Sequence, residues 1–567
     1  MKLHCCLFPN DYEFERDTLV QLWMAAGYLK DDRMEEYGRR YFDILLNKKL
    51  ILFSRIDTSS GECKYVTNVP NGNLQSEDAD IFTILKDELM GAQEVKSWHV
   101  ALRVSSDIFL SLQGLETLDL SGSHITELPG SIGNVRQLRY LNISFTLIES
   151  LPESISRLQE LQTLNLEGCK QLYALPKRFN KLNNLRHLYF DVLGQLSFMP
   201  RGMGDLTQLR TLSAFIVDDG NDCNVRELAR LNNLTGSCCI SGLLGVMFNT
   251  PGESVLSNKV HLTKLQLRWN ENMQICGEFD SDVSYLVPHS CLEELQLLYY
   301  PYRKLPEWIC EDKYKQLNSI TLRKCKINKL HICLGRLPNL KCLYLIQMNS
   351  IDIIDHGDYL RHASFPRLEK LTIDGMSCLT HWTDVESWDF PLLSEFSIKN
   401  CPKIGELYFL PFLNSLKVLE IVNCLKLRSL SHLKLNLPEK LETLTVDDCP
   451  LLNEKYFFGQ GAQWDKINHV PHICFDLQDL HSLSNDAEFS HLIKDEDADA
   501  CFVSQAPDIE PLQGNVSRRL ERELYHHMGD EHFDTQLEEL DYRKLHGKVL
   551  HLYKVYQARV LATPGRS

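Results

Sequence analysis

The chain has 567 residues, with 60 Lys and Arg against 76 Asp and Glu, which gives a formal net charge of −16. This acidic balance gives no overall bias toward nucleic acid or anionic lipid as a partner. Apolar residues make up 44% of the chain, enough for a sizeable core, so we do not expect a disordered protein. No apolar run reaches the roughly 18 residues of a membrane span, and residues 1–10 do not resemble a signal peptide. We therefore expect a soluble protein of the cytoplasm, with the nucleus as the alternative.

The first predicted elements are two helices and a strand within residues 1–56. Asp17 is expected to cap a short helix, because apolar residues follow it at helical spacing. A second helix is expected over residues 34–47, and residues 51–53 indicate a short strand. The apolar side of the second helix is expected to consist of Met34, Tyr37, Tyr41 and Leu45. Two helices followed by a small strand suit a winged-helix module.

A leucine pattern, L-x-x-L-x-L, recurs from Leu115 to Leu441 at intervals of about 23 to 30 residues. There are about 13 to 14 copies, the least regular of which includes Cys238. Within each copy the last two leucines alternate with exposed residues, as in a strand that is buried on one face. One copy buries its apolar face only against its neighbours, so the copies must stack. We predict an α/β leucine-rich-repeat solenoid over residues 98–476, a horseshoe with parallel strands along its concave face.

The most regularly spaced cysteines belong to this pattern. They fall three positions past the last leucine of a copy, where a small side chain fits inside the turn. They are Cys169, Cys325, Cys401, Cys424 and Cys449. Nineteen cysteines in a chain of this length are too dilute for a disulfide scaffold. We therefore predict that these side chains pack in the core and have no metal or redox role.

Two segments near the N-terminus carry a family resemblance: CCLFPNDYEF at residues 5–14 and LVQLWMAAGY at residues 19–28. Both closely resemble the winged-helix part of the NB-ARC switch in plant coiled-coil-type NLR immune receptors. The string WDKINHVPHI at residues 464–473 resembles the end of the repeats in the same family. The resemblance implies a plant disease resistance protein of innate immunity, N-terminally truncated to a winged-helix remnant, residues 1–56, followed by its repeats.

The nucleotide switch of that family is incomplete in this sequence. In the family, ADP or ATP is held by a phosphate loop, G-x-x-x-x-G-K-[ST], and no such string occurs here. The loop and the coiled-coil domain would lie upstream of Met1. The Met-His-Asp triplet of the family is also missing, since Tyr65-Val66 is followed by Thr67-Asn68-Val69. We therefore interpret residues 57–97 as an altered linker and expect no cofactor in this chain, with ADP or ATP in full-length family members.

Other functions fit these features less well. Acidic residues in 31–47 offset the basic ones, which disfavours DNA binding and favours a winged helix that docks on the repeats. The run that begins at Asp495 lacks the glycine and glutamate of a calcium loop, and the histidines around His526 match no zinc spacing. No set of side chains with catalytic spacing stands out, so we expect neither an enzyme nor a metal protein.

Residues 477–567 depart from the family. This tail is acidic at first and then becomes partly helical, with apolar residues at helical spacing from Tyr542 to Val560. The expected role of this helix is to dock on the last repeats. A helix that binds a partner is the alternative.

The candidate ligand contacts are the outward-facing positions of the predicted strands. Their mixture of tyrosine, amides and charges of both signs suits protein recognition, and they form no continuous basic stripe for nucleic acid. They are Tyr140, Asn142, Thr163, Asn165, His187, Tyr189, Lys264, Gln266, Arg268, Ser319, Thr321, Arg323, Tyr344, Lys370, Thr372 and Asp374.

The resemblance and these positions together indicate a receptor whose repeats bind a pathogen effector or a host protein that pathogens modify. A second hypothesis is a scaffold, decoy or regulator that cannot signal alone and pairs with a full-length NLR. A third is an incomplete gene model of a nucleotide-binding receptor.

Overall fold

The computed structural model of the chain describes residues 13–29, 32–56, 62–68, 109, 114–192, 194–196, 198–217, 224–243, 254–271, 283, 286–311, 313–329, 332–354, 365–382, 385, 389–431, 435–456, 463–475 and 478–479. The predicted features of the tail, from Asp495 through His526 to the helix that begins near Tyr542, lie outside these residues.

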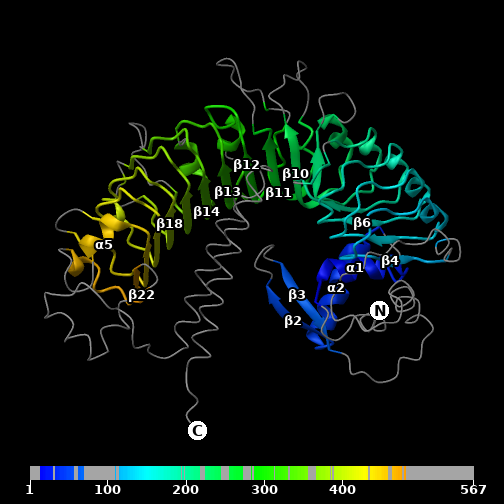
Figure 1. The fold of residues 1–567 in the computed structure, drawn as a ribbon, viewed down its shortest axis with the longest axis horizontal. Helices are drawn as coiled ribbons and strands as arrows, with labels where there is room; N and C mark the ends of the chain where they lie inside the picture. The colour runs from blue at the N-terminus through cyan, green and yellow to red at the C-terminus, as the bar shows by residue number, and fades with distance from the viewer. Residues whose placement is uncertain are drawn as a thin grey trace, which may run out of the picture.

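The N-terminal module is a winged helix (Figure 1). Its elements are β1 (Phe14–Glu15), α1 (Arg16–Ala25), α2 (Met34–Asn47), β2 (Ile51–Ile56) and β3 (Cys63–Thr67). The three strands form one antiparallel sheet in the order β1-β3-β2. The module therefore extends beyond the predicted boundary at residue 56. Strand β3 carries no clear sequence signal, because its residues do not alternate between apolar and polar.

Two details of the helices differ from the prediction. Asp17 does not cap α1; it lies in the first turn, and its carboxylate accepts a hydrogen bond from Arg39 of α2, with Nη2 and Oδ2 2.7 Å apart. Of the predicted apolar side of α2, Met34, Tyr37 and Leu45 pack against the core of the module, whereas Tyr41 is 43% exposed. The residues of α2 that are fully buried include Gly38 and Phe42. A Cβ atom on Gly38 would lie 2.4 Å from a methyl carbon of Val20, so the glycine allows α1 to pack closely against α2.

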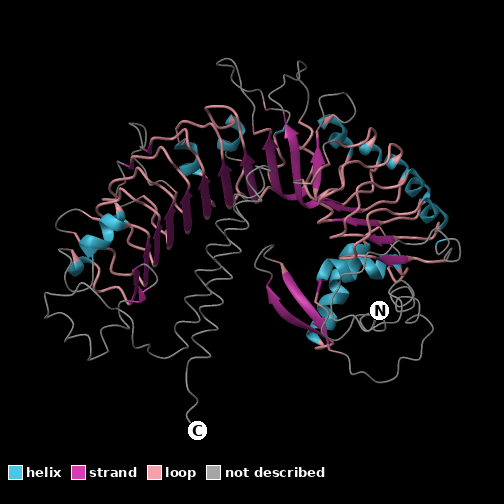
Figure 2. Ribbon diagram, viewed as in Figure 1, coloured by secondary structure: helices cyan, strands magenta, loops and turns pink. Residues whose placement is uncertain are grey.

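The solenoid is built on two consecutive sheets (Figures 1 and 2). The first, five-stranded sheet contains β4 (Thr117–Asp119), β5 (Tyr140–Asn142), β6 (Thr163–Leu166), β7 (His187–Phe190) and β8 (Thr211–Leu212). The second, twelve-stranded sheet contains β9 (Ala214–Ile216), β10 (Thr235–Leu243), β11 (His261–Trp269), β12 (Glu294–Leu298), β13 (Ser319–Arg323), β14 (Cys342–Ile346), β16 (Lys370–Asp374), β18 (Glu395–Lys399), β19 (Val418–Val422), β20 (Thr443–Asp447), β21 (His472–Phe475) and β22 (Gln478–Asp479). All neighbouring strands are parallel except β21 and β22.

The return segments lie on the outer side of the horseshoe (Figure 2). They include a short helix, α5 (Pro450–Tyr456), and a separate two-stranded pair, β15 (Ile353–Ile354) and β17 (His381–Trp382). The other turns are 3₁₀ helices: η2 (Gly130–Asn134), η3 (Glu153–Arg157), η4 (Phe179–Lys181), η5 (Met203–Asp205), η6 (Val225–Arg230), η8 (Glu307–Cys310), η9 (Ile332–Arg336), η10 (Leu410–Phe412) and η11 (Trp464–Lys466). Prolines precede several of them, since a fixed φ and a missing donor end extended structure.

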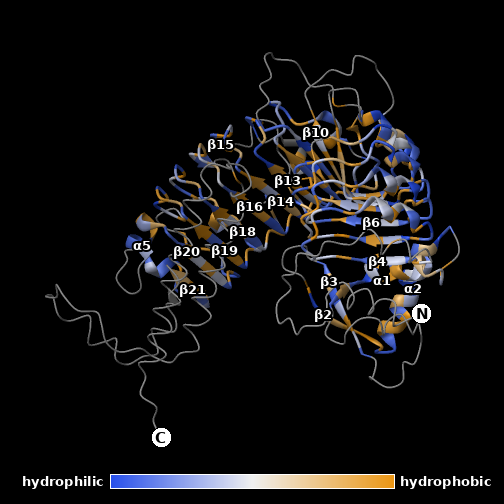
Figure 3. Ribbon diagram, turned by 45° about the vertical axis from the view of Figure 1, so that its right-hand side comes forward, coloured by the Kyte–Doolittle hydropathy of each residue, from blue (hydrophilic) through white to orange (hydrophobic). Residues whose placement is uncertain are grey.

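A single hydrophobic cluster fills the space between the strands and the outer turns, from Phe109 to Phe475. The leucines of the repeat point into it: Leu141, Leu164 and Leu343 are at most 1% exposed. Figure 3 shows the same division, with orange concentrated on the strands and blue on many of the outer turns. The predicted solenoid is therefore confirmed, with parallel strands on the concave face. In the part of the chain that the structure describes, no helix has the length and apolar character to cross a membrane.

The cysteines of the repeat lie in the turn that follows each strand. Asn400 and Asn423 adopt left-handed backbone angles, φ 52°, and each is followed by a buried cysteine. The thiol of Cys424 donates to the carbonyl oxygen of Val422, 3.5 Å away. Interaction with the Cys401 thiol, together with burial, raises the pKa of Cys424 to about 12. These thiols are buried packing groups, as the repeat pattern predicted.

Candidate functional site

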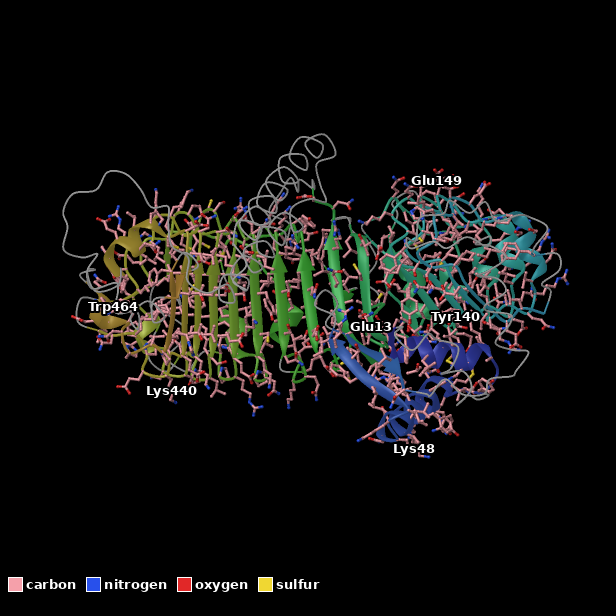
Figure 4. The ribbon with its side chains drawn as sticks, turned by 60° about the horizontal axis from the view of Figure 1, so that its bottom comes forward. Glu13, Lys48, Tyr140, Glu149, Lys440 and Trp464 are labelled. Carbon is pink, nitrogen blue, oxygen red and sulfur yellow. The ribbon has the colours of Figure 1, made fainter. Side chains whose placement is uncertain are left out.

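The winged helix contacts the concave side of the first coils (Figures 1 and 4). Tyr140 of β5, 2% exposed, packs against Leu22 and Ala25 of α1. The backbone carbonyl of Ala25 accepts a hydrogen bond from Arg139 Nη1 at 3.0 Å. These contacts join segments more than a hundred residues apart, so the docking that the sequence suggested for the winged helix is present in the fold.

The centre of this contact is a buried carboxylate. Glu35 of α2 is 8% exposed and lies against the residues that begin β7 and β8. Arg186 donates to both of its oxygens, from Nε to Oε1 at 2.7 Å and from Nη2 to Oε2 at 2.9 Å. Arg210 Nε and His187 Nε2 lie 3.3 and 3.4 Å from Oε1. Such a forked arginine–carboxylate pair fixes orientation as well as charge.

Neighbouring contacts hold the same cluster in place. The carbonyl oxygen of Asp32 accepts hydrogen bonds from the guanidinium groups of Arg186 and Arg210. The other ring nitrogen of His187, Nδ1, lies 3.1 Å from the hydroxyl of Thr211. The start of α2 is therefore bound to two successive coils of the solenoid through both side-chain and backbone atoms.

The protonation of Glu35 is set by two opposing effects. Burial opposes ionisation of its carboxyl group, but the hydrogen bonds and the positive charge of Arg186 outweigh burial. The pKa of Glu35 is consequently held well below its usual range. The carboxylate is thus charged at neutral pH and attracts the arginines.

We expect the docking to weaken in acid. Because the pKa of Glu35 is lower in the docked state, its contribution is fully present above the ordinary glutamate pKa of about 4.3 and is lost as the pH falls below it. Hydroxyl-radical footprinting of Tyr140 between about pH 6 and pH 3.5 measures this loss. Oxidation of Tyr140 should increase on acidification in the wild type, and Glu35→Gln should remove most of this pH dependence.

The predicted ligand contacts on the first coils are covered. Tyr140, Thr163 and His187 are 2%, 1% and 4% exposed, and Asn142 is 8% exposed. This corrects the expectation that these positions face an open surface. The cause is the winged helix on β5 and β7, together with contacts between adjacent strands, such as Asn142 Nδ2 to Asp119 Oδ2 at 3.1 Å.

Two predicted contacts on the same coils remain partly exposed, namely Asn165 and Tyr189. Gln21 of α1 donates to the hydroxyl oxygen of Tyr189 at 2.6 Å. Burial of the hydroxyl group at the end of the side chain raises the pKa of this tyrosine, which therefore stays protonated. Tyr189 thus belongs to the contact with the winged helix.

The predicted contacts on the later coils lie on open strands. They occupy β11 to β16 and are partly or fully exposed: Lys264, Gln266, Arg268, Ser319, Thr321, Arg323, Tyr344, Lys370, Thr372 and Asp374. The strand register brings them into rows, so that Thr321 lies beside Tyr344 and Tyr344 beside Thr372. We call strands β11 to β20 of the twelve-stranded sheet the open strands, because no described contact joins the winged helix to them. Their role in binding stays a prediction.

Charges on the open strands are paired from one coil to the next. Lys264 lies 2.9 Å from Glu294, Lys370 lies 2.9 Å from Glu395, and Lys399 lies 2.8 Å from Glu420. At the starts of the strands, Lys341–Glu369 and Lys417–Glu442 pair in the same way. Arg268 stacks on the ring of Tyr299, 5.1 Å from its centre. The surface is therefore mixed in charge. Such a mixture suits the binding of a protein, whereas a nucleic-acid groove would carry a continuous basic stripe.

Glu35, Arg186 and Arg210 were not identified from the sequence as contact residues. One signal was available: an arginine precedes the strand in three of the first copies, at Arg139, Arg186 and Arg210. All three contact the winged helix. Glu35 itself carries no such signal, since it is one of several acidic residues in its helix.

Comparison with known families identifies both parts of the chain. Residues 7–68 match the family model of a disease resistance protein winged helix domain, and residues 130–383 match that of a leucine-rich repeat region. The fold and its docked module thus define a leucine-rich-repeat solenoid that carries the winged helix of disease resistance proteins.

Plant proteins of this description are similar over most of the chain. RGA1 of Solanum bulbocastanum is 32% identical over 481 residues, which cover 80% of this chain and 48% of the relative. RGA2 of the same plant is 33% identical, with coverages of 73% and 45%, and the RPP13-like protein 1 of Arabidopsis thaliana is 31% identical, also with 73% and 45%. The chain belongs to the family of plant disease resistance proteins with a winged helix and leucine-rich repeats. It spans about half the length of the curated relatives that it matches.

Among solved structures, a leucine-rich-repeat protein of Leptospira interrogans is 20% identical, with a TM-score of 0.39 over 66% of this chain and 86% of that one.

Proposed function

We propose that this chain is a recognition protein of plant innate immunity that acts in the cytoplasm. Its open strands bind a pathogen effector, or a host protein that a pathogen modifies, while the winged helix stays on the first coils. The observation that carries the proposal is this division of one concave face into a part that α1 and α2 contact and a part that they do not. Membership of the disease resistance family supports the immune role.

The chemistry of the open strands supports binding to a protein. A stacked sheet offers a wide and rigid surface, on which few side chains lose freedom when a ligand binds. Tyr344 and Arg323, of the residue types that dominate binding energy in protein interfaces, lie on adjacent strands there. The proposed role is binding, and it needs no catalytic group.

We further propose that recognition in this chain works without a nucleotide of its own. The motif that would hold the phosphates is missing from its 567 residues. Expression of the chain alone in leaf tissue should therefore cause no cell death. Cell death from this polypeptide alone would contradict the proposal, and would also argue against a decoy or a regulator of a full-length receptor.

The ligand surface can be tested by blocking it. The chain is expressed in leaf tissue with a panel of secreted pathogen proteins, and co-purification is measured for each. Thr321→Trp with Thr372→Trp places two bulky side chains in the middle of the open strands and should reduce capture of a bound protein at least tenfold. The matched control, Lys177→Trp with Lys181→Trp, changes two exposed residues of the outer side.

Two outcomes decide the proposal. The proposal is supported if the control variant still captures the ligand protein and the variant with blocked open strands does not. If the variant with blocked open strands still captures the ligand protein and the control variant does not, the ligand binds the outer side and the proposal is overturned.

A further inference from the structure

The middle of the open strands carries a row of polar side chains without charge. We call this row the polar strip; it consists of Gln266, Gln296, Thr321, Tyr344, Thr372 and Ser397. Each member lies directly beside the next on the neighbouring strand. All six are partly exposed. At about 4.8 Å between strands, the strip runs for roughly 24 Å across the sheet.

Most of the charged residues beside this strip already have a partner. On the side toward the strand ends, Arg268 lies over the ring of Tyr299 and Asp374 accepts a hydrogen bond from Asn400. On the other side, Lys264 pairs with Glu294 and Lys370 with Glu395. At its end, Lys399 pairs with Glu420. A ligand that placed a carboxylate or an ammonium group here would have to compete with these pairs. The charged residues therefore favour a ligand segment that brings no net charge of its own.

Apart from Ser397, whose hydroxyl donates to Glu420 Oε2 at 3.0 Å, the members of the strip offer both donors and acceptors of hydrogen bonds. Hydroxyl and amide groups do both, unlike Lys, Arg or carboxylate side chains. Gln266 and Gln296 already form an amide pair, with Nε2 and Oε1 3.2 Å apart. The hydroxyls of Thr321 and Thr372 bond to none of the residues that the structure describes. A polypeptide main chain also alternates donors and acceptors, every residue carrying one of each.

The length of the strip fits an extended segment. A strand rises about 3.3 Å per residue, so roughly seven residues would cover 24 Å. Such a segment would lie across the strands of the sheet, and side chains, not strand edges, would satisfy its backbone groups.

We infer that the polar strip binds an extended, uncharged segment of a protein ligand through hydrogen bonds to its main chain. This inference rests on the proposed function and specifies the part of the ligand that the open strands contact. The binding should depend on hydroxyl and amide groups and only weakly on salt, because few charges are involved.

A peptide display library of extended 12-residue sequences, selected on the purified full chain, tests this inference. Enriched peptides should be polar and close to neutral. Thr321→Val, Tyr344→Phe and Thr372→Val together remove three hydroxyls and keep the shapes of the side chains. Three lost hydrogen bonds should weaken the selected peptides at least about tenfold. The matched control, Lys370→Gln with Glu395→Gln, removes a flanking ion pair and should change affinity less than about threefold.

The outcomes separate this inference from the proposed function. Neutral peptides that lose affinity in the hydroxyl variant, and keep it between 50 and 500 mM salt, support the inference. Enriched peptides that are strongly charged, and that depend on salt or on the Lys370–Glu395 pair, would overturn it and leave the proposed surface in place. If the enriched peptides bind the variant with Thr321→Trp and Thr372→Trp as tightly as the wild type, both the inference and the proposed binding surface would be overturned. A selection without any enriched peptide would overturn the inference alone.

Discussion

Replacing Glu35 by alanine is expected to release the winged helix from the solenoid. The substitution leaves Arg186 and His187, both under 10% exposed, without the carboxylate that they contact. Removing one partner of a buried ion pair costs about 3–5 kcal/mol. A cysteine introduced at Ala25, the last residue of α1 and 1% exposed against Tyr140, reports this change through its rate of labelling by a thiol reagent. Labelling at this position should accelerate by about a hundredfold or more in the Glu35→Ala variant.

The neighbouring residue provides the control. Glu36 pairs with Arg40 one turn along the same helix, and both side chains are exposed. Such surface pairs contribute about 0.3–0.5 kcal/mol. Glu36→Ala should therefore change the labelling rate of the introduced cysteine less than about threefold. Equal acceleration in both variants would mean that the general charge of α2 is responsible, and not the buried cluster.

Replacing Leu345 by alanine should destabilise the solenoid, whereas replacing its neighbour Tyr344 should not. Leu345 points into the core and is 1% exposed, while Tyr344 points outward from the same strand. Truncating a buried leucine to alanine costs about 2–5 kcal/mol because it removes apolar contacts and leaves a cavity. Tyr344→Ala should cost less than about 1 kcal/mol, since substitutions away from the core have small effects.

Denaturant unfolding followed by circular dichroism measures both variants. In a solenoid each coil contacts mainly its neighbours, so the loss at Leu345 should spread to the coils on either side. A similar loss in both variants would contradict the division between an inward row of leucines and an outward row of contact residues.

The fold of the solenoid could be predicted from the sequence because its cause is local. Each copy contains its own strand, turn and core leucines, so one pattern specifies every coil. The cysteines illustrate this: their position after the strand, at Cys401 and Cys424, indicated a buried turn residue, and both are buried. Helix α1 was predictable for the same reason, since its apolar residues recur at helical spacing.

Features that depend on contacts between distant segments could not be predicted. Glu35 and Arg186 are separated by 151 positions, and no local pattern pairs them. The helical pattern of α2 placed Met34, Tyr37 and Leu45 correctly against the core but also favoured Tyr41, which is exposed. The close approach of α1 at Gly38 sets which side of α2 is fully buried. Strand β3 forms because β2 offers it an edge, and its own residues carry little signal.

The candidate site was therefore predictable only in part. The repeat shows which residues face outward, and on the open strands those residues, such as Tyr344 and Thr372, are accessible. It cannot show what covers them, so Tyr140 and His187 were expected on an open surface but lie beneath the winged helix. Whether an outward-facing residue is buried depends on how the winged helix packs on the repeats, which the repeat pattern does not encode.

The docking of the winged helix through Glu35 is tested most directly by a double-mutant cycle with Arg186. Labelling of the cysteine at Ala25 is measured in the parent, in Glu35→Ala, in Arg186→Ala and in the double variant. Close charge pairs in buried contacts show coupling energies of about 1.5 kcal/mol or more, and we expect at least this value here. A coupling energy within about 0.5 kcal/mol of zero, as for residues that do not touch, would contradict the account.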